Sequence, residues 1–124
     1  MTANILMVIL IALPQGGVSA SFVNVDSAQE CESRLGRIRP ILEQADEKLL
    51  HAGCHLSTAQ FSLFDHDPPV DAPRFLYEVG IKGASASIRR LSHGEECDGS
   101  GLVAGEAEIT SCATSIQQLI STAQ

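Results

Sequence analysis

Three short clusters of this chain combine side chains that could take part in chemistry. The first contains His51, Cys54 and His55, and a cysteine with two histidines offers ligands that zinc prefers. A histidine near a helix end, however, also interacts favourably with the helix dipole, and a cysteine in an exported chain is typical of a disulfide. The C-x-x-C spacing of zinc and thioredoxin-like sites is absent. The sequence therefore predicts no metal site and no cofactor.

The second cluster is Asp65, His66 and Asp67, in which an imidazole lies between two carboxylates. Such neighbours raise the pKa of a histidine and prepare it for acid–base work. Adjacent residues of a turn point in different directions, however, and no known motif supplies a nucleophile. We interpret this segment as a solvated turn and predict no catalytic residue.

The third cluster, Glu95, Glu96 and Asp98, lies in a polar, glycine-rich loop over residues 93–101. Its spacing does not match the calcium loop of an EF-hand, which favours a solvated acidic loop over a calcium site. The chain has a net charge of −7, and this loop is its most concentrated negative patch. We predict that these three acidic residues contact a partner protein of basic character.

Charge also limits the other classes of partner. A net charge of −7 repels nucleic-acid phosphates and anionic membrane surfaces, and the one adjacent basic pair is Arg89–Arg90. The sequence therefore excludes nucleic acid as a partner and predicts no membrane association after removal of a leader.

The first twenty residues have the layout of a cleavable secretory signal. An apolar run over residues 5–13 is followed by Pro14 and by small residues that end at Ala20. The run is shorter than the ~18–20 residues that span a bilayer. We predict a signal peptide over residues 1–20 and a single secreted or periplasmic domain over residues 21–124. The alternative is that the apolar run forms a buried helix or strand.

A long helix is predicted directly after this leader. Ser27 and Glu30 have the S-x-x-E spacing of a capping box. Pro40 removes one helical hydrogen bond and kinks a helix. Because the apolar stripe keeps its phase across the proline, we predict one kinked helix over residues 27–52. The stripe consists of Cys31, Leu35, Ile38, Leu42, Ala45 and Leu49.

After Gly53 the apolar period changes to that of strands. Phe61 and Leu63 alternate with polar residues, and the same alternation is clear over residues 75–81. Lys82–Gly83 is a suitable turn into a third strand over residues 84–91, although this segment could instead form a short helix.

The end of the chain predicts a short fourth strand, residues 102–109, and then a helix that begins at Thr110 or Ser111. Together the segments predict an α+β domain. A long, proline-kinked N-terminal helix packs on a three- to four-stranded antiparallel sheet, a short helix follows at the C-terminus, and disulfides staple the domain.

Four cysteines allow three disulfide pairings. In a continuous helix Cys31 and Cys54 would lie roughly 35 Å apart, far beyond the ~7 Å that a disulfide allows. Following the predicted strands back and forth places Cys97 near Cys31, and Cys112 near Cys54. We therefore predict Cys31–Cys97 and Cys54–Cys112. If residues 84–91 do not cross the sheet, Cys97–Cys112 becomes the alternative.

Two functions remain open at this point. The first is a small, acidic, disulfide-stabilised binding or inhibitory module that recognises an extracytoplasmic basic protein through Glu95, Glu96 and Asp98. The alternative is a small extracytoplasmic metal-dependent or hydrolytic enzyme that uses His51, His55 and His66. The absence of catalytic motifs favours the binding module.

Overall fold

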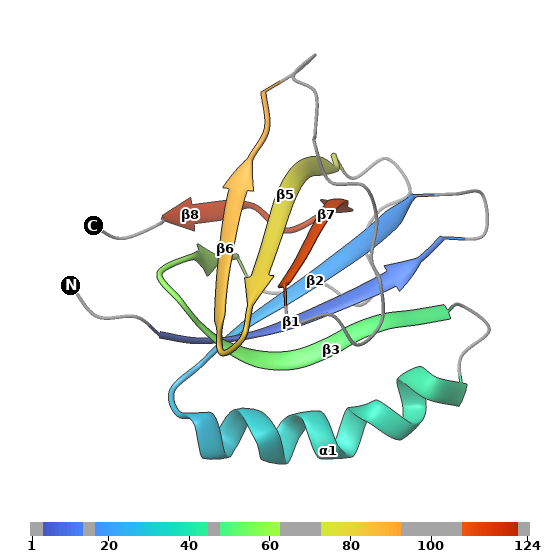
Figure 1. The fold of residues 1–124 in the computed structure, drawn as a ribbon, viewed down its shortest axis with the longest axis vertical. Helices are drawn as coiled ribbons and strands as arrows, with labels where there is room; N and C mark the ends of the chain where they lie inside the picture. Colours follow the sequence, from blue (N-terminus) through green and yellow to red (C-terminus); the bar gives the residue numbers. More distant parts are fainter. Residues whose placement is uncertain (1–3, 14–16, 45–47, 63–72, 93–107, 122–124) are drawn as a thin grey trace.

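The computed structural model describes residues 4–13, 17–44, 48–62, 73–92 and 108–121 (Figure 1). These residues form one helix and eight strands. In chain order they are β1 (Asn4–Ala12), β2 (Val18–Val25), α1 (Ala28–Gln44), β3 (Lys48–Ser57), β4 (Gln60–Phe61), β5 (Phe75–Lys82), β6 (Ser85–Arg90), β7 (Glu108–Ser115) and β8 (Leu119–Ser121).

Six of the strands close into a barrel in the order β1-β2-β7-β5-β6-β3. The barrel consists of two three-stranded antiparallel sheets, which we call the N-terminal sheet (β2-β1-β3) and the C-terminal sheet (β7-β5-β6). Short parallel pairings join the two sheets at both seams, Ser19 with Thr114 and Leu56 with Ser85. The strands β4 and β8 form a separate two-stranded sheet.

This architecture shows that the predicted α+β fold is wrong. The described part of the chain holds one helix and a closed barrel, where the sequence predicted two helices on a three- to four-stranded sheet. The β5–β6 hairpin is confirmed, with Lys82 paired to Ser85 across the turn and Gly83 at a φ of 56°. Glycine adopts this left-handed conformation without steric cost.

The predicted C-terminal helix is also wrong, because residues 108–115 form β7 and residues 119–121 form β8. Along β7 the buried side chains are Ser111, Ala113 and Ser115, which alternate with less buried ones. Small residues at every second position fit an inward strand face opposite the large side chain of Tyr77. The apolar residues that suggested the helix are divided between the two strands and their connection: Cys112 lies in β7, Ile116 follows it, and Leu119 and Ile120 lie in β8.

Aromatic side chains fill the interior of the barrel. Phe22 and Phe61 stack with ring centroids 4.0 Å apart, and Tyr77 meets both rings edge-on at 5.9 and 5.7 Å. The Tyr77 hydroxyl donates to the Gln117 carbonyl at 2.8 Å and accepts from the Leu119 amide at 2.9 Å. These two bonds satisfy the one polar group of the aromatic cluster.

A buried glutamine joins the two ends of the chain. The Gln117 side chain is 1% exposed. Its Oε1 accepts from the Phe22 amide at 2.8 Å, and its Nε2 donates to the carbonyls of Phe22 at 2.6 Å and Ser62 at 2.8 Å. The side chain thus takes the place of a neighbouring strand for the Phe22 backbone, so that no buried backbone group of this residue stays unpaired.

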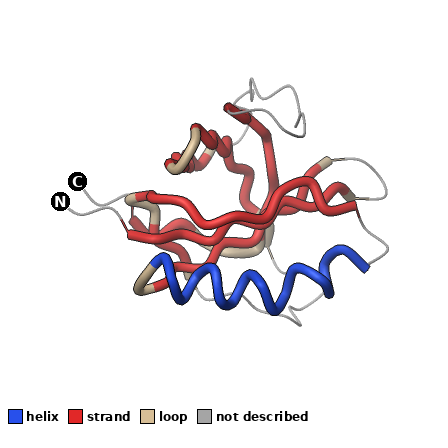
Figure 2. The backbone as a smooth tube through the Cα atoms, turned by 60° about the horizontal axis from the view of Figure 1, so that its bottom comes forward, coloured by secondary structure: helices blue, strands red, loops and turns tan. Residues whose placement is uncertain are grey.

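Strand β1 is apolar on both faces because both faces are covered. Leu6, Val8 and Leu10 point into the barrel and are fully buried. Met7 and Ile9 point outward and pack with the buried side of α1 in a second cluster. Figure 2 shows α1 running along one side of the strands. A strand covered on both sides needs no polar alternation.

These residues belong to the segment predicted as a leader. The fold does not test the predicted cleavage after Ala20, which stays a prediction. Cleavage there would remove all of β1 and the first three residues of β2.

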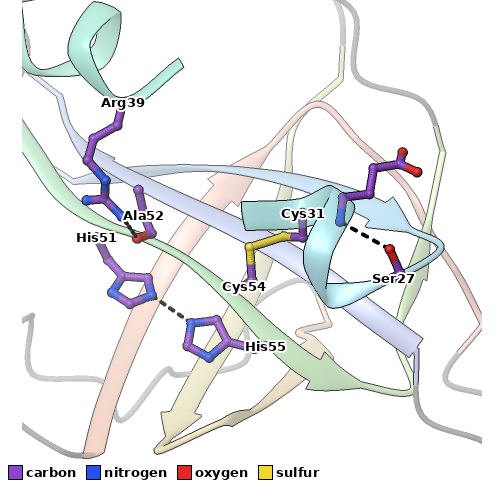
Figure 3. The surroundings of a disulfide bond; sticks show 8 residues. Ser27, Cys31, Arg39, His51, Ala52, Cys54 and His55 are labelled. Atoms are coloured by element: carbon purple, nitrogen blue, oxygen red, sulfur yellow. Dashed lines mark hydrogen bonds between the residues drawn. A yellow bond between two sulfur atoms is a disulfide. The ribbon is translucent and has the colours of Figure 1, made fainter. Parts of the chain in front are cut away.

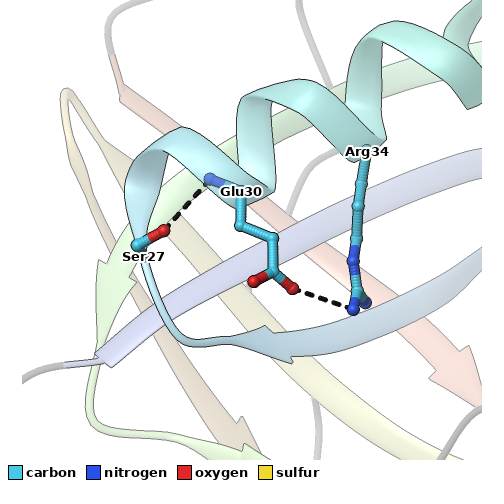
Figure 4. Close-up of polar contacts among 3 residues, drawn as sticks. All are labelled: Ser27, Glu30 and Arg34. Carbon is cyan, nitrogen blue, oxygen red and sulfur yellow. Dashed lines mark hydrogen bonds and ion pairs between the residues drawn. The ribbon is translucent and has the colours of Figure 1, made fainter.

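Helix α1 begins as the sequence predicts and ends earlier. The Ser27 hydroxyl accepts from the Glu30 amide at 3.1 Å, and the Glu30 carboxylate pairs with Arg34 at 2.9 Å (Figure 4). The helix continues through Pro40 to Gln44, and residues 48–57 then form β3. The predicted helix over 27–52 is therefore too long at its C-terminal end.

The early end of the helix changes the disulfide pairing. The chain reverses after α1, and β3 runs back beside the helix, so that Cys54 returns to Cys31 with a Cα–Cα distance of 6.1 Å (Figure 3). Cys31–Cys54 is therefore a disulfide, and the predicted pairs Cys31–Cys97 and Cys54–Cys112 are both wrong. The exclusion of this pair assumed a continuous helix. Cys112 is also disulfide-bonded.

Candidate functional site

A hollow on the described surface lies between α1 and the outer face of the N-terminal sheet. Helix α1 lies closest to β3, where the Cys31–Cys54 disulfide and a 2.9 Å bond from Arg39 Nη2 to the Ala52 carbonyl hold it. The described residues therefore cover the outer face of β1 and β2 only in part. A groove of about 730 Å³ remains there.

The wall of this groove is mainly apolar. Met7, Ile9 and Ile11 form its floor, and Ile41 of the helix is 69% exposed beside it. The complete lining is Met7, Ile9, Ile11, Ser21, Phe22, Val23, Asn24, Arg34, Arg37, Ile38, Ile41, Leu42, Phe61 and Ser62. Met7 and Ile9 are buried at the bottom of the groove, and Ile41 is the exposed apolar side chain at its rim.

Two arginines of α1 give the groove its charge. Arg34 pairs with Glu30, and both side chains are nearly half exposed. Arg37 is exposed and makes no ion pair with another described residue. No acidic side chain of the described ranges lines the groove. In a chain with a net charge of −7, this groove is locally suited to an anion.

Asn24 fixes the far end of the groove. Its Nδ2 donates to the Ala59 carbonyl at 2.9 Å, and its Oδ1 accepts from the Phe61 amide at 2.8 Å. Together with Gln117, which holds Ser62, this amide positions β4 beside β2. The end wall of the groove is thus held by side-chain bonds to the backbone rather than by strand pairing with β2.

A second arrangement lies on the other face of the N-terminal sheet. In the register of β3 with β1, His51 is opposite Leu10 and His55 is opposite Leu6, so both histidines share the inward face of the sheet. Their Nε2 atoms lie 2.8 Å apart (Figure 3). We call these two residues the histidine pair. The groove is lined by the opposite face of β1, so the histidine pair does not belong to it.

Gly53, between the two histidines, gives the rings their space. A Cβ atom at this position would lie 2.9 Å from Nε2 of His55 and 3.0 Å from Nε2 of His51. Such contacts are shorter than van der Waals distances, so any larger residue would push the rings apart. The sequence H-x-G-x-H on a strand therefore permits two imidazoles to meet over the backbone.

Both imidazoles are neutral near pH 7. Burial lowers the pKa of His51 to about 4, with further contributions from His55 and Arg39. Burial also lowers the pKa of His55, and the Gly83 backbone and Glu32 offset part of this shift. One ring therefore donates and the other accepts in the Nε2 contact. Nδ1 of His55 is buried without a hydrogen bond of good geometry.

The structure separates the residues of the first predicted cluster. Cys54 is in a disulfide on the helix side of β3, whereas His51 and His55 lie on the inward side. Within the described ranges no group of three or more metal-ligating residues occurs. The two other predicted clusters, Asp65 to Asp67 and the acidic loop with Glu95, Glu96 and Asp98, lie outside the described residues. The acidic contact surface stays a prediction.

Sequence reasoning missed the groove and Gln117. Met7, Ile9 and Ile11 occupy every second position, as one face of a strand does. Because the residues between them are also apolar, no alternation of polar and apolar residues was visible. Ile41 lies beside the predicted helix stripe, and an apolar residue outside the stripe was a signal for a second apolar helix face. Nothing in the sequence distinguishes Gln117 from its neighbour Gln118.

The Cys31–Cys54 disulfide indicates an oxidising, extracytoplasmic compartment. Among the described residues, no helix has both the length and the apolar character needed to cross a membrane. Comparisons of this chain with protein-family models, with curated proteins and with solved structures find no match.

Proposed function

We propose that this chain is a secreted or periplasmic binding module that takes an anionic amphiphile, such as a fatty acid, into the groove between α1 and the N-terminal sheet. The observation that carries the proposal is the composition of the groove: a mainly apolar wall with two arginines and no acidic side chain in its described lining. The proposal concerns a chain that keeps β1, because Met7, Ile9 and Ile11 form the floor.

The size of the groove fits a small ligand. A volume of about 730 Å³ lies within the ~300–1,000 Å³ that is usual for ligand pockets. Each methylene transferred from water to the apolar wall contributes ~0.8 kcal/mol. Eight buried methylenes would contribute roughly 6 kcal/mol before the loss of ligand freedom is subtracted. An unbranched chain also suits a groove that is open along one side.

The arginines suit the other end of such a ligand. A guanidinium binds a carboxylate or phosphate through two parallel hydrogen bonds and is weakly hydrated, so it keeps its charge beside apolar surface. Arg37 has no ionic partner among the described residues, and it is therefore the stronger candidate for the headgroup. Arg34 already pairs with Glu30, and a ligand would have to compete with that carboxylate.

Binding of dodecanoate to the full chain, measured by isothermal titration calorimetry, tests the proposal. We expect binding of dodecanoate and at least about tenfold weaker binding of dodecanol, because a charge-assisted bond contributes about 1.5–3 kcal/mol. Arg37→Ala should lower the affinity for dodecanoate to that for dodecanol. Arg89→Ala on β6 is the matched control, since it removes an equal charge from an exposed arginine of the C-terminal sheet.

Three results would contradict the proposal: no binding of dodecanoate, equal affinity for acid and alcohol, or equal effects of Arg37→Ala and Arg89→Ala. A second copy of the chain is the other occupant that would cover this face. Dimerisation in sedimentation experiments that dodecanoate does not reverse would assign the groove to self-association instead.

A further inference from the structure

We infer that the histidine pair, His51 and His55 over Gly53, is a binding site for a divalent transition-metal ion, with Cu²⁺ as the preferred ion. The proposal is independent of the groove, because the pair lies on the opposite face of the N-terminal sheet. Two nitrogen ligands from the chain would leave the remaining coordination positions to water or a small solute.

The type of ligand atom carries the choice of metal. Imidazole binds copper, nickel and zinc with bonds of ~2.0 Å. Two neighbouring nitrogens around a square-planar or tetragonal ion then lie about 2.9 Å apart, whereas tetrahedral zinc requires about 3.3 Å. The observed Nε2–Nε2 distance is 2.8 Å. This is the length of a hydrogen bond, and it shows that both nitrogens can reach one ion. Cu²⁺ is the preferred ion because it forms the strongest complexes with nitrogen ligands.

The rings must turn for an ion to bind. Their centroids are 5.1 Å apart with an angle of 27° between the planes, so in the metal-free pair the two nitrogens face each other and share one proton. An ion binds when the shared proton moves to Nδ1 of its own ring, so that both Nε2 lone pairs are free to turn toward the same point. The missing side chain at Gly53 leaves room for this movement, because a Cβ would fill the space under both nitrogens.

The exposure of the two histidines and the fixed position of their strand also suit a metal ion. His51 is partly exposed, whereas His55 is 7% exposed. The ion would thus reach the pair at His51 and bind with His55 inside the barrel. His55 lies beside the seam where the Leu56 amide donates to the Ala84 carbonyl at 2.7 Å, which fixes the strand that holds both rings. A held strand reduces the freedom that the ligands lose on binding.

Titration of the full chain with Cu²⁺, Ni²⁺ and Zn²⁺ by calorimetry, with electron paramagnetic resonance of the Cu²⁺ complex, tests this inference. We expect one equivalent of Cu²⁺ with two nitrogen couplings, and weaker binding of Ni²⁺ and Zn²⁺. His51→Ala and His55→Ala should each weaken Cu²⁺ binding at least about tenfold. Gly53→Ala should do the same although both ligands remain, because its Cβ displaces the rings.

The matched control is the double variant His66→Ala/His93→Ala, which removes the other two histidines of the chain. It should leave Cu²⁺ binding unchanged. Binding that survives His51→Ala and His55→Ala, or that the control variant abolishes, would overturn the inference. Circular dichroism of each variant shows that it is folded. If Gly53→Ala does not fold, the two histidine variants decide.

Discussion

The two sheets of the barrel have similar inward faces and different outward ones. In the C-terminal sheet, inward Val79 and Ile88 are buried and face each other, while Ser87 and Arg89 on the outer side are exposed. In the N-terminal sheet, Met7 on the outer side of β1 is as buried as Leu6 on the inner side. The difference is α1, which covers one sheet and not the other.

This difference accounts for where a ligand can bind. A sheet with a polar outer face needs no cover and offers no apolar groove. An apolar outer face requires a cover, and a helix tied to one edge by Cys31–Cys54 leaves part of that face accessible. The same disulfide that stabilises the helix thus keeps it near β3 and away from β2.

The largest expected effect comes from removing residues 1–20. Leu6, Met7, Val8 and Leu10 are fully buried, and burial of such side chains contributes ~1.5–3 kcal/mol each. Their loss is comparable to the ~5–15 kcal/mol net stability of a domain. We expect residues 21–124 alone to lack cooperative thermal unfolding by circular dichroism. An exported protein that begins at Ser21 by intact mass and unfolds cooperatively would contradict the barrel.

The next effect concerns the link that Gln117 makes across the β2 and β7 seam. Gln117→Leu keeps the volume but leaves the Phe22 amide and the carbonyls of Phe22 and Ser62 unpaired. Each unpaired buried group costs about 1–3 kcal/mol, so the loss of three bonds should destabilise the chain by at least roughly 3 kcal/mol in urea. Gln118→Leu, at the exposed neighbour, is the control and should change stability by less than about 0.5 kcal/mol. Equal effects would show that the two sheets do not depend on this side chain.

Loss of the disulfide should affect the helix-covered sheet. Cys31 and Cys54 are 23 residues apart, and a loop of this length predicts ~3 kcal/mol of stabilisation. The double variant Cys31→Ala/Cys54→Ala should lower the urea midpoint accordingly. Non-reducing peptide mapping of the wild-type chain checks the pairing, and a peptide that joins Cys31 to Cys97 would refute it. The same mapping identifies the partner of Cys112, which is also disulfide-bonded.

A smaller decrease in the free energy of unfolding is expected at acidic pH. The pKa of His51 is about 4 in the folded chain and 6.5 in the unfolded chain, so only the unfolded chain gains this proton between those values. Stability is therefore unaffected above pH 6.5 and falls as the pH decreases from 6.5 to 4. After a discount of about half for partial exposure, we expect a loss of about 1–2 kcal/mol. In metal-free buffer His51→Gln should remove part of the slope; an unchanged slope would contradict the low pKa.

The same difference between the sheets explains what could be predicted from the sequence. Strand β5 and its hairpin with β6 were predicted correctly because one face of each is buried and the other is not. Strand β1 is covered on both faces, so its apolar run has no period of two. Such a run does not distinguish a buried strand from the apolar core of a signal peptide.

The boundary between α1 and β3 could not be predicted for a related reason. Leu49 continues the helix stripe in phase, yet it packs under α1 from the strand that follows. A strand residue that packs against the helix is as apolar as a residue on the buried side of the helix, so hydropathy does not distinguish the two. The error of eight residues at this helix end then excluded the correct disulfide. The sequence shows that His51 and His55 are residue types that bind metals. That their rings meet depends on the strand conformation of β3 and on the missing side chain at Gly53.

The most direct test of a ligand site in the helix-covered sheet uses Met7. The chain contains two methionines, Met1 and Met7, and Met7 lies on the floor of the groove. We propose methyl-labelled methionine spectra of the full chain with a fatty acid that has a nitroxide on its alkyl chain. We predict strong broadening of the Met7 methyl signal, which unlabelled dodecanoate reverses by competition. A Met7 signal that is unchanged at saturating ligand would contradict it.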